Sequence, residues 1–455
     1  LGSILKGDVN PSGRLTDTYI YDLTKSYNFN NIGDFQFDNV EEFYDKDTPE
    51  GALFKQGYNK VSFINYIEGI YIGYKFYETA AVEGLINYDD VVQYPFGYGL
   101  SYTTFSQKMS DLSVNDSGDL SFDVTVTNTG DVAGKDVVQV YFTPPYTNGG
   151  IEKSEVNLIE FEKTDILKPG ESQTLSFTFN ESEMASYDEF GNRCYVLEAG
   201  DYKISIRNDS HTEIDSRVYT KDNEIVYNQN NPRPSDKIAA ENEFDYAKRD
   251  VTYLSRKDHF ANYEEATAAP KNFSMSDDIK AVYLNNDNYD SSKFNNKEDK
   301  MPTLGASNKV MLSDLVGLDY DDPLWEDLLD KLTIDEMVNL LGKAGFSTTA
   351  IESIGKIQTN EVDGPAGLHS FFNKKMQGNS YQAPNMLGNT WNKELAAKFG
   401  SQIGKEANEI GVNGWYGPAM NIHRSAFSGR NFEYYSEDAV LSGRIAAETV
   451  KAAQE

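Results

Sequence analysis

Alternating apolar and polar residues are the clearest signal in this chain, and they lie between residues 106 and 218. Residues 120–127 alternate with a period of two, which is the period of a strand that has one buried face. Comparable β-rich runs, separated by turn-forming residues, occur at 137–142, 175–179 and 202–206. Several short strands within one segment of this length predict an antiparallel β-sandwich at residues 106–218.

The pattern changes to alternating helix and strand from residue 321 onward. Thr333 and Glu336 form a capping box before an amphipathic stretch, and residues 393–410 predict a helix that ends at Gly411. The other expected elements are two strands and a last helix, at 356–362, 412–416 and 436–455. Such alternation predicts parallel strands and the (β/α)8 barrel architecture, but a complete barrel needs about 250 residues. We therefore expect residues 321–455 to be only the N-terminal part of a barrel.

The two remaining segments lack a long periodic pattern. Residues 1–105 open with a helix end and a cluster of turn formers, and they close with an aromatic, glycine-rich stretch at 94–102. We interpret residues 1–105 as the C-terminal part of an α/β sandwich domain with its connecting loop. Residues 219–320 are rich in Asn, Asp, Lys and Ser, so we expect a polar linker there. The chain is therefore expected to be multidomain and truncated at both ends.

Composition and charge narrow the function classes. Hydrophobic residues make up 39% of the chain, which is enough for packed cores. The formal net charge of −31 repels phosphate backbones and anionic membranes, which argues against nucleic acid as a partner and suits a neutral substrate. No apolar run approaches the roughly 18 residues of a transmembrane helix. We therefore expect no such helix. A cytoplasmic location is a separate expectation.

Reactive side chains are few. Cys194 is the single cysteine, so an intramolecular disulfide is impossible. We expect Cys194 to be a small, half-buried strand residue rather than a reactive thiol. Four histidines and one cysteine do not make a recognisable zinc cluster, and neither a metal nor another cofactor is expected.

Asp363 follows the expected strand at 356–362 and opens the motif Asp-Gly-Pro-Ala-Gly-Leu-His, which ends at His369. A carboxylate at the C-terminal end of a barrel strand lies in the mouth of the active site. There it can accept hydrogen bonds from two neighbouring sugar hydroxyls. The alternative is a local role, in which Asp363 forms an Asx-turn or caps a helix.

A second polar motif, residues 421–438, contains Arg424 and Arg430. Arg430 lies between a glycine and an aromatic stretch, and its guanidinium offers a rigid fork of donors to a sugar hydroxyl or to a carboxylate. Glu433 and Glu437 are interpreted as orienting partners or as charges at the start of a helix. A catalytic role for Glu433 is disfavoured because no matching second carboxylate lies close to it in the sequence.

These motifs resemble the barrel signatures of family 3 glycoside hydrolases. The resemblance rests on Asp363-Gly-Pro-Ala-Gly-Leu, Asn421-Ile-His-Arg and Gly429-Arg-Asn-Phe-Glu-Tyr-Tyr-Ser-Glu-Asp. Residues 7–14, 67–79 and 94–105 are similar to the end of that family's α/β sandwich domain, and the β-sandwich resembles its fibronectin type III-like domain. Most members carry the barrel first. The order found here, with the β-sandwich before the barrel, resembles the permuted β-glucosidases of some anaerobic bacteria.

The resemblance implies a retaining hydrolysis that removes terminal, non-reducing β-D-glucose from oligosaccharides or glucosides. Its nucleophile Asp and its acid/base Glu are expected outside this segment. The segment alone is therefore expected to be inactive and to need the rest of the polypeptide or a complementary chain. By matching positions, Asp363 and Arg430 bind hydroxyls of the glucose ring, and Arg424 is a further candidate. His369 stands where the family often has Arg, which leaves the glycone preference open.

Other functions stay open on the sequence. One is a non-catalytic module that binds polysaccharide or another protein, which the intact motif around Arg430 argues against. Another is a β-xylosidase or an N-acetylglucosaminidase of the same family, and the attached β-sandwich makes the latter less suitable. The sequence also leaves open whether the protein forms a homo-oligomer.

Overall fold

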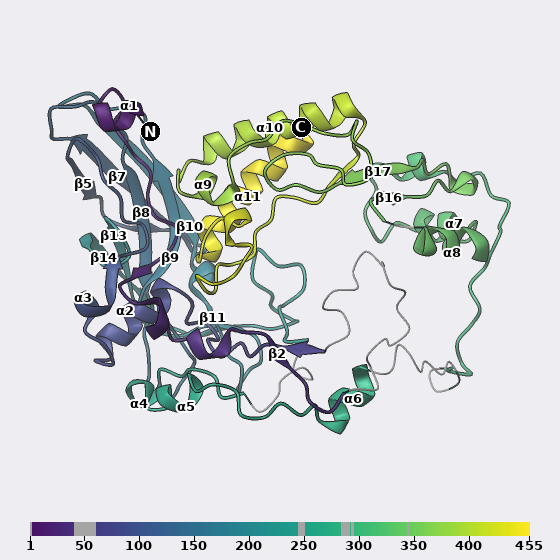
Figure 1. Ribbon diagram of the computed structural model, residues 1–455, viewed down its shortest axis with the longest axis horizontal. Coiled ribbons are helices and arrows are strands. Elements are labelled where there is room, and N and C mark those ends of the chain that lie inside the picture. Colours follow the sequence, from purple (N-terminus) through teal and green to yellow (C-terminus); the bar gives the residue numbers. More distant parts are fainter. Residues whose placement is uncertain (1, 41–60, 244–250, 284–291, 293–294, 344) are drawn as a thin grey trace. The chain divides into compact units, whose positions relative to one another are not determined.

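The computed structural model describes residues 2–40, 61–243, 251–283, 292, 295–343 and 345–455 (Figure 1). The chain divides into two compact units. The first unit comprises Leu1–Tyr283, Pro384–Ala396 and Met420–Glu448, and the second comprises Leu284–Ala383, Ala397–Ala419 and Thr449–Glu455. Parts of the C-terminal third of the chain therefore belong to the same unit as the N-terminal half.

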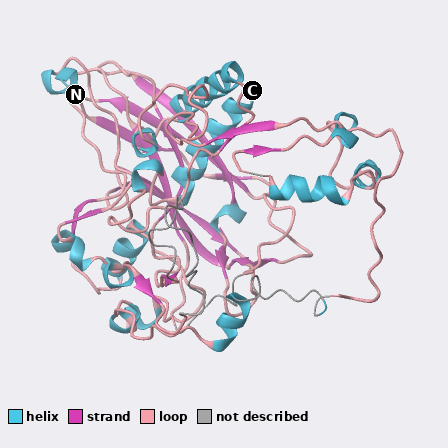
Figure 2. Ribbon diagram, turned by 45° about the vertical axis from the view of Figure 1, so that its right-hand side comes forward, coloured by secondary structure: helices cyan, strands magenta, loops and turns pink. Residues whose placement is uncertain are grey.

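The first unit contains a β-sandwich made of two four-stranded sheets, seen as the large group of strands in Figure 2. One sheet has the order β10-β7-β5, with β6 also paired to β7, and the other has the order β14-β13-β8-β9. All of these pairs are antiparallel. The strands are β5 Phe105–Met109, β6 Ser113–Val114, β7 Asp119–Asn128, β8 Val137–Thr143, β9 Asn157–Lys163, β10 Ser172–Asn180, β13 Gly200–Arg207 and β14 Glu213–Lys221.

The alternating sequence pattern corresponds to the packing of this sandwich. Every second residue of β7 is buried, and its partner β10 shows the same alternation. Phe122 and Phe177 stack across the pair with ring centres 5.4 Å apart, inside one core shared by both sheets. The predicted antiparallel β-sandwich is confirmed. Its strands continue past residue 218, because β14 ends at Lys221 and β15 (Ile225–Tyr227) pairs with β12 (Tyr195–Leu197).

Residues 61–105 form short elements around an aromatic core. Tyr74, the first residue of α2 (Tyr74–Val82), stacks on Phe96 with ring centres 4.6 Å apart. The ring of Phe96 also lies 5.3 Å from that of Trp391. The remaining elements of the described N-terminal region are short: α1 Gly2–Lys6, β1 Tyr19–Ile20, β2 Phe35–Gln36, β3 Ser62–Phe63, α3 Tyr88–Val91 and β4 Val92–Tyr94. The helix end expected at the start of the chain is α1, which ends before Gly7.

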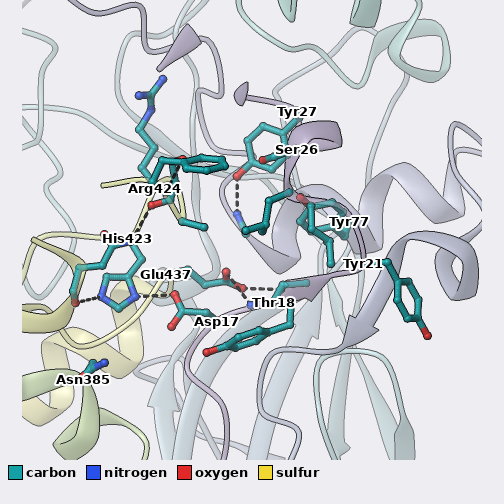
Figure 3. Close-up of a pocket in the computed structure, with 18 residues that line it drawn as sticks. Asp17, Thr18, Tyr21, Ser26, Tyr27, Tyr77, Asn385, His423, Arg424 and Glu437 are labelled. Atoms are coloured by element: carbon teal, nitrogen blue, oxygen red, sulfur yellow. Dashed lines mark hydrogen bonds and ion pairs between the residues drawn. The ribbon is translucent and has the colours of Figure 1, made fainter. Parts of the chain in front are cut away.

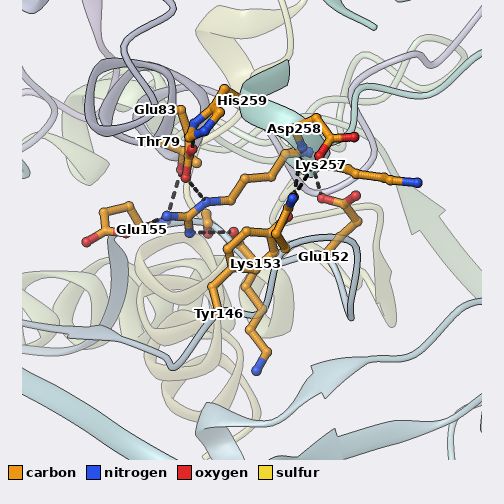
Figure 4. A network of polar contacts seen from close by, with 12 residues as sticks. Thr79, Glu83, Tyr146, Glu152, Lys153, Glu155, Lys257, Asp258 and His259 are labelled. Carbon is orange, nitrogen blue, oxygen red and sulfur yellow. Dashed lines mark hydrogen bonds and ion pairs between the residues drawn. The ribbon is translucent and has the colours of Figure 1, made fainter. Parts of the chain in front are cut away.

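The expected polar linker is structured in part. Its described residues contain α4 Lys257–Phe260, α5 Tyr263–Ala266, α6 Asp277–Tyr283 and the 3-10 helix η7 Leu312–Leu315. Phe260 is buried beside Phe76 of α2. The Arg256 guanidinium is nearly inaccessible and contacts Glu83 at 2.6 Å and Glu155 at 2.9 Å, two of the residues labelled in Figure 4. These contacts attach the segment around residues 251–266 to the first unit.

The second unit begins with two helices and a small sheet. The elements are α7 Leu324–Leu329, α8 Ile334–Gly342, β16 Ser347–Thr348, β17 Thr359–Val362 and β18 Gly414–Trp415. The capping box before α8 is confirmed, since Thr333 Oγ1 accepts the backbone N–H of Glu336 and the Glu336 side chain accepts that of Thr333. β17 pairs with β18 in parallel and with β16 in antiparallel fashion. The parallel pair is the arrangement that the helix–strand alternation predicted.

The two long helices near the C-terminus agree with the sequence pattern to different degrees. α10 (Lys393–Ile410) has the predicted bounds, and Gly411 follows it with φ of +76°. α11 (Ala439–Gln454) begins three residues later than predicted, because Asp438 Oδ1 accepts the N–H of Leu441. Among the described residues, no helix combines the length and the apolar character that crossing a membrane requires.

Candidate functional site

Asp363 lies directly after β17, on a loop whose shape depends on two glycines. The backbone N–H groups of Asp363 and His369 each donate to the other residue's carbonyl oxygen, at 3.1 Å and 2.8 Å. Gly364 and Gly367 both have positive φ, and a Cβ on Gly364 would lie 1.9 Å from the carbonyl oxygen of Gly367. The indole N–H of Trp415 donates to the Gly364 carbonyl at 2.9 Å. The loop is therefore tightly closed.

The Asp363 side chain is only partly exposed, and one oxygen accepts the backbone N–H of Gly364 at 2.8 Å. This bond is local, but it is not an Asx-turn, which would accept from the N–H two residues on. His369 is exposed on the same loop, where its Nδ1 lies 2.7 Å from Gln377 Oε1. The structure thus brings Asp363 and His369 together.

Aromatic rings surround this loop, and the sequence reasoning did not identify them. Phe346 lies 5.4 Å from Phe372 and 5.4 Å from Tyr416, measured between ring centres, and His369 lies 5.0 Å from Phe371. Phe371 and Phe372 are 62% and 73% exposed, which is unusual for such large apolar side chains. The signal in the sequence was the Phe-Phe pair within a polar loop. The hydroxyl of Tyr416 donates to Glu361, and this bond raises the pKa of Tyr416.

Arg430 lies in the first unit with an accessible guanidinium, whose side chain is 71% exposed. Its Nε donates to the buried Glu433, and its charge lies 6.0 Å from the ring centre of Tyr434. Glu433 is therefore an orienting partner, as one interpretation of the sequence had it.

Arg424 is placed differently from Arg430. Its guanidinium is mostly buried, lies 2.5 Å from Glu68, and donates to the carbonyl oxygen of Asn65 at 2.7 Å. The ring of Tyr66 covers it at 4.6 Å. Arg424 also lines a cavity in the first unit, shown in Figure 3. These contacts hold residues 65–68, so a sugar contact by Arg424 stays a prediction.

The four predicted site residues divide between the two units. Asp363 and His369 belong to the second unit, and Arg424 and Arg430 belong to the first. The expectation that Asp363 and Arg430 contact the same sugar ring therefore stays a prediction. Within the described residues, no group of three or more His, Cys, Asp or Glu side chains could hold a metal ion.

Two domain families match parts of the chain. Residues 136–210 match the fibronectin type III-like domain, and this range contains the sandwich strands β8, β9, β10 and β13. Residues 367–455 match the glycosyl hydrolase family 3 N terminal domain, which covers His369, Arg424 and Arg430. Both matches fall where the sequence motifs resembled this family.

The relatives are named as β-glucosidases. Beta-glucosidase A of Butyrivibrio fibrisolvens is 29% identical over 99% of this chain and 52% of its own length, and a beta-glucosidase of Ruminococcus albus is 29% identical over 98% and 42%. The chain thus spans about half the length of these relatives. The crystal structure of a β-glucosidase from Paenibacillus barengoltzii covers 99% of this chain and 45% of its own, with a TM-score of 0.68 at 23% identity, which shows a shared fold. Residues 367–455 thus match glycoside hydrolase family 3, and nearly the whole chain is similar to proteins named as β-glucosidases.

Proposed function

We propose that the protein containing this chain is a β-glucosidase, which removes terminal, non-reducing β-D-glucose from oligosaccharides or glucosides. The names of both near-full-length relatives support this activity. Their alignments run along 98–99% of this chain, which supports the same order of segments in those relatives, with the β-sandwich before the barrel motifs.

The Asp363 loop is the structural observation that carries this proposal. A carboxylate at the end of a parallel strand, on a loop fixed by two glycines, presents an oriented acceptor to a ligand. Charged acceptors form stronger hydrogen bonds with hydroxyl groups than neutral ones. We propose that Asp363 binds two neighbouring hydroxyls of glucose and that His369 contributes to the same contact.

The exposed rings beside Asp363 support a carbohydrate substrate. Phe371, Phe372 and Tyr416 present aromatic surface close to a carboxylate. A sugar ring has hydroxyl groups around its edge and apolar C–H groups on its faces. A site that joins a carboxylate with aromatic faces matches both properties of this ligand.

The proposed mechanism is a retaining double displacement. It requires a nucleophilic Asp and an acid/base Glu about 5–5.5 Å apart, on the two sides of the scissile bond. We propose that neither lies within these 455 residues, and that this segment supplies part of the sugar-binding surface, with Arg430 contacting hydroxyls near the reaction centre.

Hydrolysis of an aryl β-glucoside by the full-length polypeptide tests the proposal. We expect Asp363→Asn to lower kcat/KM by about 100-fold or more, because it removes a charged acceptor worth about 3 kcal/mol of transition-state binding. Asp321→Asn, at an exposed aspartate of the same unit, is the matched control and should change little. Wild-type-like activity of Asp363→Asn would contradict the site. Faster cleavage of an aryl β-xyloside, or binding of insoluble glucan without any hydrolysis, would contradict the activity.

A further inference from the structure

The first unit contains a cavity of about 460 Å³ that the proposed activity does not use (Figure 3). Its walls come from residues 17–27, from Gly73 and Tyr77, from Asn385, and from the segment 423–437. All of these belong to the first unit, whereas Asp363 belongs to the second. Binding sites for small organic molecules usually have volumes of about 300–1,000 Å³. The cavity is large enough for one sugar ring.

One wall of the cavity carries a paired carboxylate and imidazole. Nδ1 of His423 lies 2.6 Å from Asp17 Oδ1, and Nε2 lies 2.8 Å from the carbonyl oxygen of Asn431. Burial lowers the pKa of His423, but the hydrogen bond to Asp17 and the negative charge of Asp17 outweigh it, so the net shift is upward. Because the folded protein holds this proton more tightly than a free imidazole does, the two groups form a pair without net charge below about pH 6.5. Arg424 and Glu68 form a second such pair.

Glu437 also faces this cavity, and its carboxyl group is buried. The backbone N–H of Thr18, the hydroxyl of Thr18 and the backbone N–H of Tyr74 donate to it at 2.9, 2.7 and 2.9 Å. Burial, and then the negative charge of Asp17, raise the pKa of Glu437 to about 8. Glu437 is therefore mostly uncharged at neutral pH. The other titratable groups at the cavity, apart from the two pairs, are the phenols of Tyr19, Tyr21, Tyr27 and Tyr77.

The cavity also offers aromatic faces and a free amide. Tyr19, Tyr21 and Phe427 line it and each remains about half exposed. Phe427 is held edge-on by Phe29, with ring centres 5.6 Å apart. The partly exposed amide of Asn385, seen at the edge of Figure 3, can both donate and accept hydrogen bonds. This combination of rings and polar groups, without net charge, favours a neutral polyhydroxy ligand over an ion.

We propose that this cavity is a second sugar-binding site, which takes one neutral hexose ring such as glucose. Phe427 and the two tyrosines contact the apolar faces of the sugar, and Asp17 and Asn385 hydrogen-bond its hydroxyl groups. The site goes beyond the proposed β-glucosidase activity, and it does not depend on the catalytic carboxylates.

Calorimetric titration of the 455-residue chain with D-glucose tests this site. The measurement is made in an Asp363→Asn background, so that the other proposed sugar contact is disabled. We expect Phe427→Ala and Asn385→Ala each to weaken glucose binding by at least tenfold. Phe432→Ala is the matched control, because Phe432 is similarly exposed five residues away and does not line the cavity. D-Glucuronate, which has the same ring with a negative charge, should bind at least tenfold more weakly than glucose.

Three results would overturn the proposal: no binding of glucose in the Asp363→Asn background, equal binding by Phe427→Ala and Phe432→Ala, or a preference for glucuronate. Circular dichroism of each variant separates loss of the site from loss of the fold. Since no hydrolysis is measured, the result is independent of the β-glucosidase assay. If the full-length protein does not hydrolyse a β-glucoside, this binding site is not contradicted. If it does, the binding site is not thereby shown.

Discussion

A carboxylate that starts a helix and a carboxylate that is buried in a core have the same appearance in a sequence. Glu437, between a serine and an aspartate, was interpreted as an orienting partner or as a helix-start charge. The structure buries it instead, because Thr18 and Tyr74 donate to it from positions 419 and 363 residues away. No local pattern encodes such distant donors. The sequence could therefore identify the motif around residues 421–438, but not the role of this residue.

The pH dependence of stability tests the state of Glu437. Its pKa is about 8 in the folded protein, against about 4.3 in an unfolded chain. The folded state holds this proton more tightly, so the stability it provides is full below about pH 4 and is lost as the pH rises toward 8. Glu437→Gln stays neutral at every pH. We expect its free energy of unfolding to fall less than that of the wild type between pH 5 and pH 9, by at least about 1 kcal/mol.

Urea unfolding at pH 5, 7 and 9 measures this difference. Glu264→Gln, at an exposed glutamate of α5, is the control and should follow the wild-type profile. If Glu437→Gln also follows the wild-type profile, Glu437 is already ionised at pH 5 or is in contact with water. The conclusion that Glu437 is uncharged where it faces the cavity would then be wrong.

Gly73 is constrained both by its own backbone conformation and by the side chain of Glu437 beside it. It precedes α2 with φ of +57°, and a Cβ there would lie 2.1 Å from Cδ of Glu437. Gly84 has a similar φ of +75° but open space around its Cα. We expect Gly84→Ala to cost about 1 kcal/mol of stability from backbone strain alone. Gly73→Ala should cost about 2–4 kcal/mol, because overpacking is added to the strain. Equal losses in urea unfolding would argue against the close contact with Glu437.

At the scale of elements, the predictable parts are those whose periodicity extends over several residues. Strand β7 was predictable because every second one of its ten residues is buried, and α10 because its pattern continues to a glycine. The strands β1 and β2 have two residues each, which is too short for any period. Helix α8 has the expected cap and apolar side chains, yet none of its residues is buried. A sequence pattern can predict a helix without predicting what covers it.

The expected linker at residues 219–320 was the least predictable segment, because its polar composition gives no sign that Arg256 is buried. Arg256 occurs in a polar stretch, but its guanidinium is buried between Glu83, Glu155 and the ring of Tyr146, which lies at 4.3 Å. We expect Arg256→Ala to destabilise the first unit by about 3–5 kcal/mol, since two carboxylates lose their buried partner. Hydrogen exchange should increase first in residues 251–266.

The neighbouring Lys257 gives a matched control for this anchor. Its side chain is exposed, so Lys257→Ala should leave exchange in residues 251–266 unchanged. Arg256→Lys keeps the charge but cannot contact both carboxylates with a planar fork, and we expect an intermediate loss. Equal exchange in Arg256→Ala and Lys257→Ala would show that apolar packing of Phe260, rather than the ion pairs, holds this segment.

At the scale of the whole molecule, the sequence motifs indicated a resemblance to family 3 glycoside hydrolases, and both domain matches agree with it. The site could be predicted only in part. The closed loop at Asp363 follows from its glycines, which the sequence shows directly. The aromatic surface around that loop could not be predicted, because Phe346 meets Phe371, Phe372 and Tyr416 only through folding. Phe346 and Tyr416 are 70 positions apart in the sequence, and no local sequence pattern indicates that two such residues will be in contact.

Activity of the 455 residues alone is the sharpest test at this scale. A retaining glycosidase needs two carboxylates that both face the substrate. The partly exposed Asp17 and the buried Glu437 do not meet this need, because His423 pairs with Asp17 while Thr18 and Tyr74 donate to Glu437. We therefore expect no hydrolysis of an aryl β-glucoside by this chain, and activity once it is joined or mixed with the further segments that its longer relatives contain. If the chain alone is active and Glu437→Gln abolishes that activity, the catalytic acid lies in the cavity and our assignment is wrong.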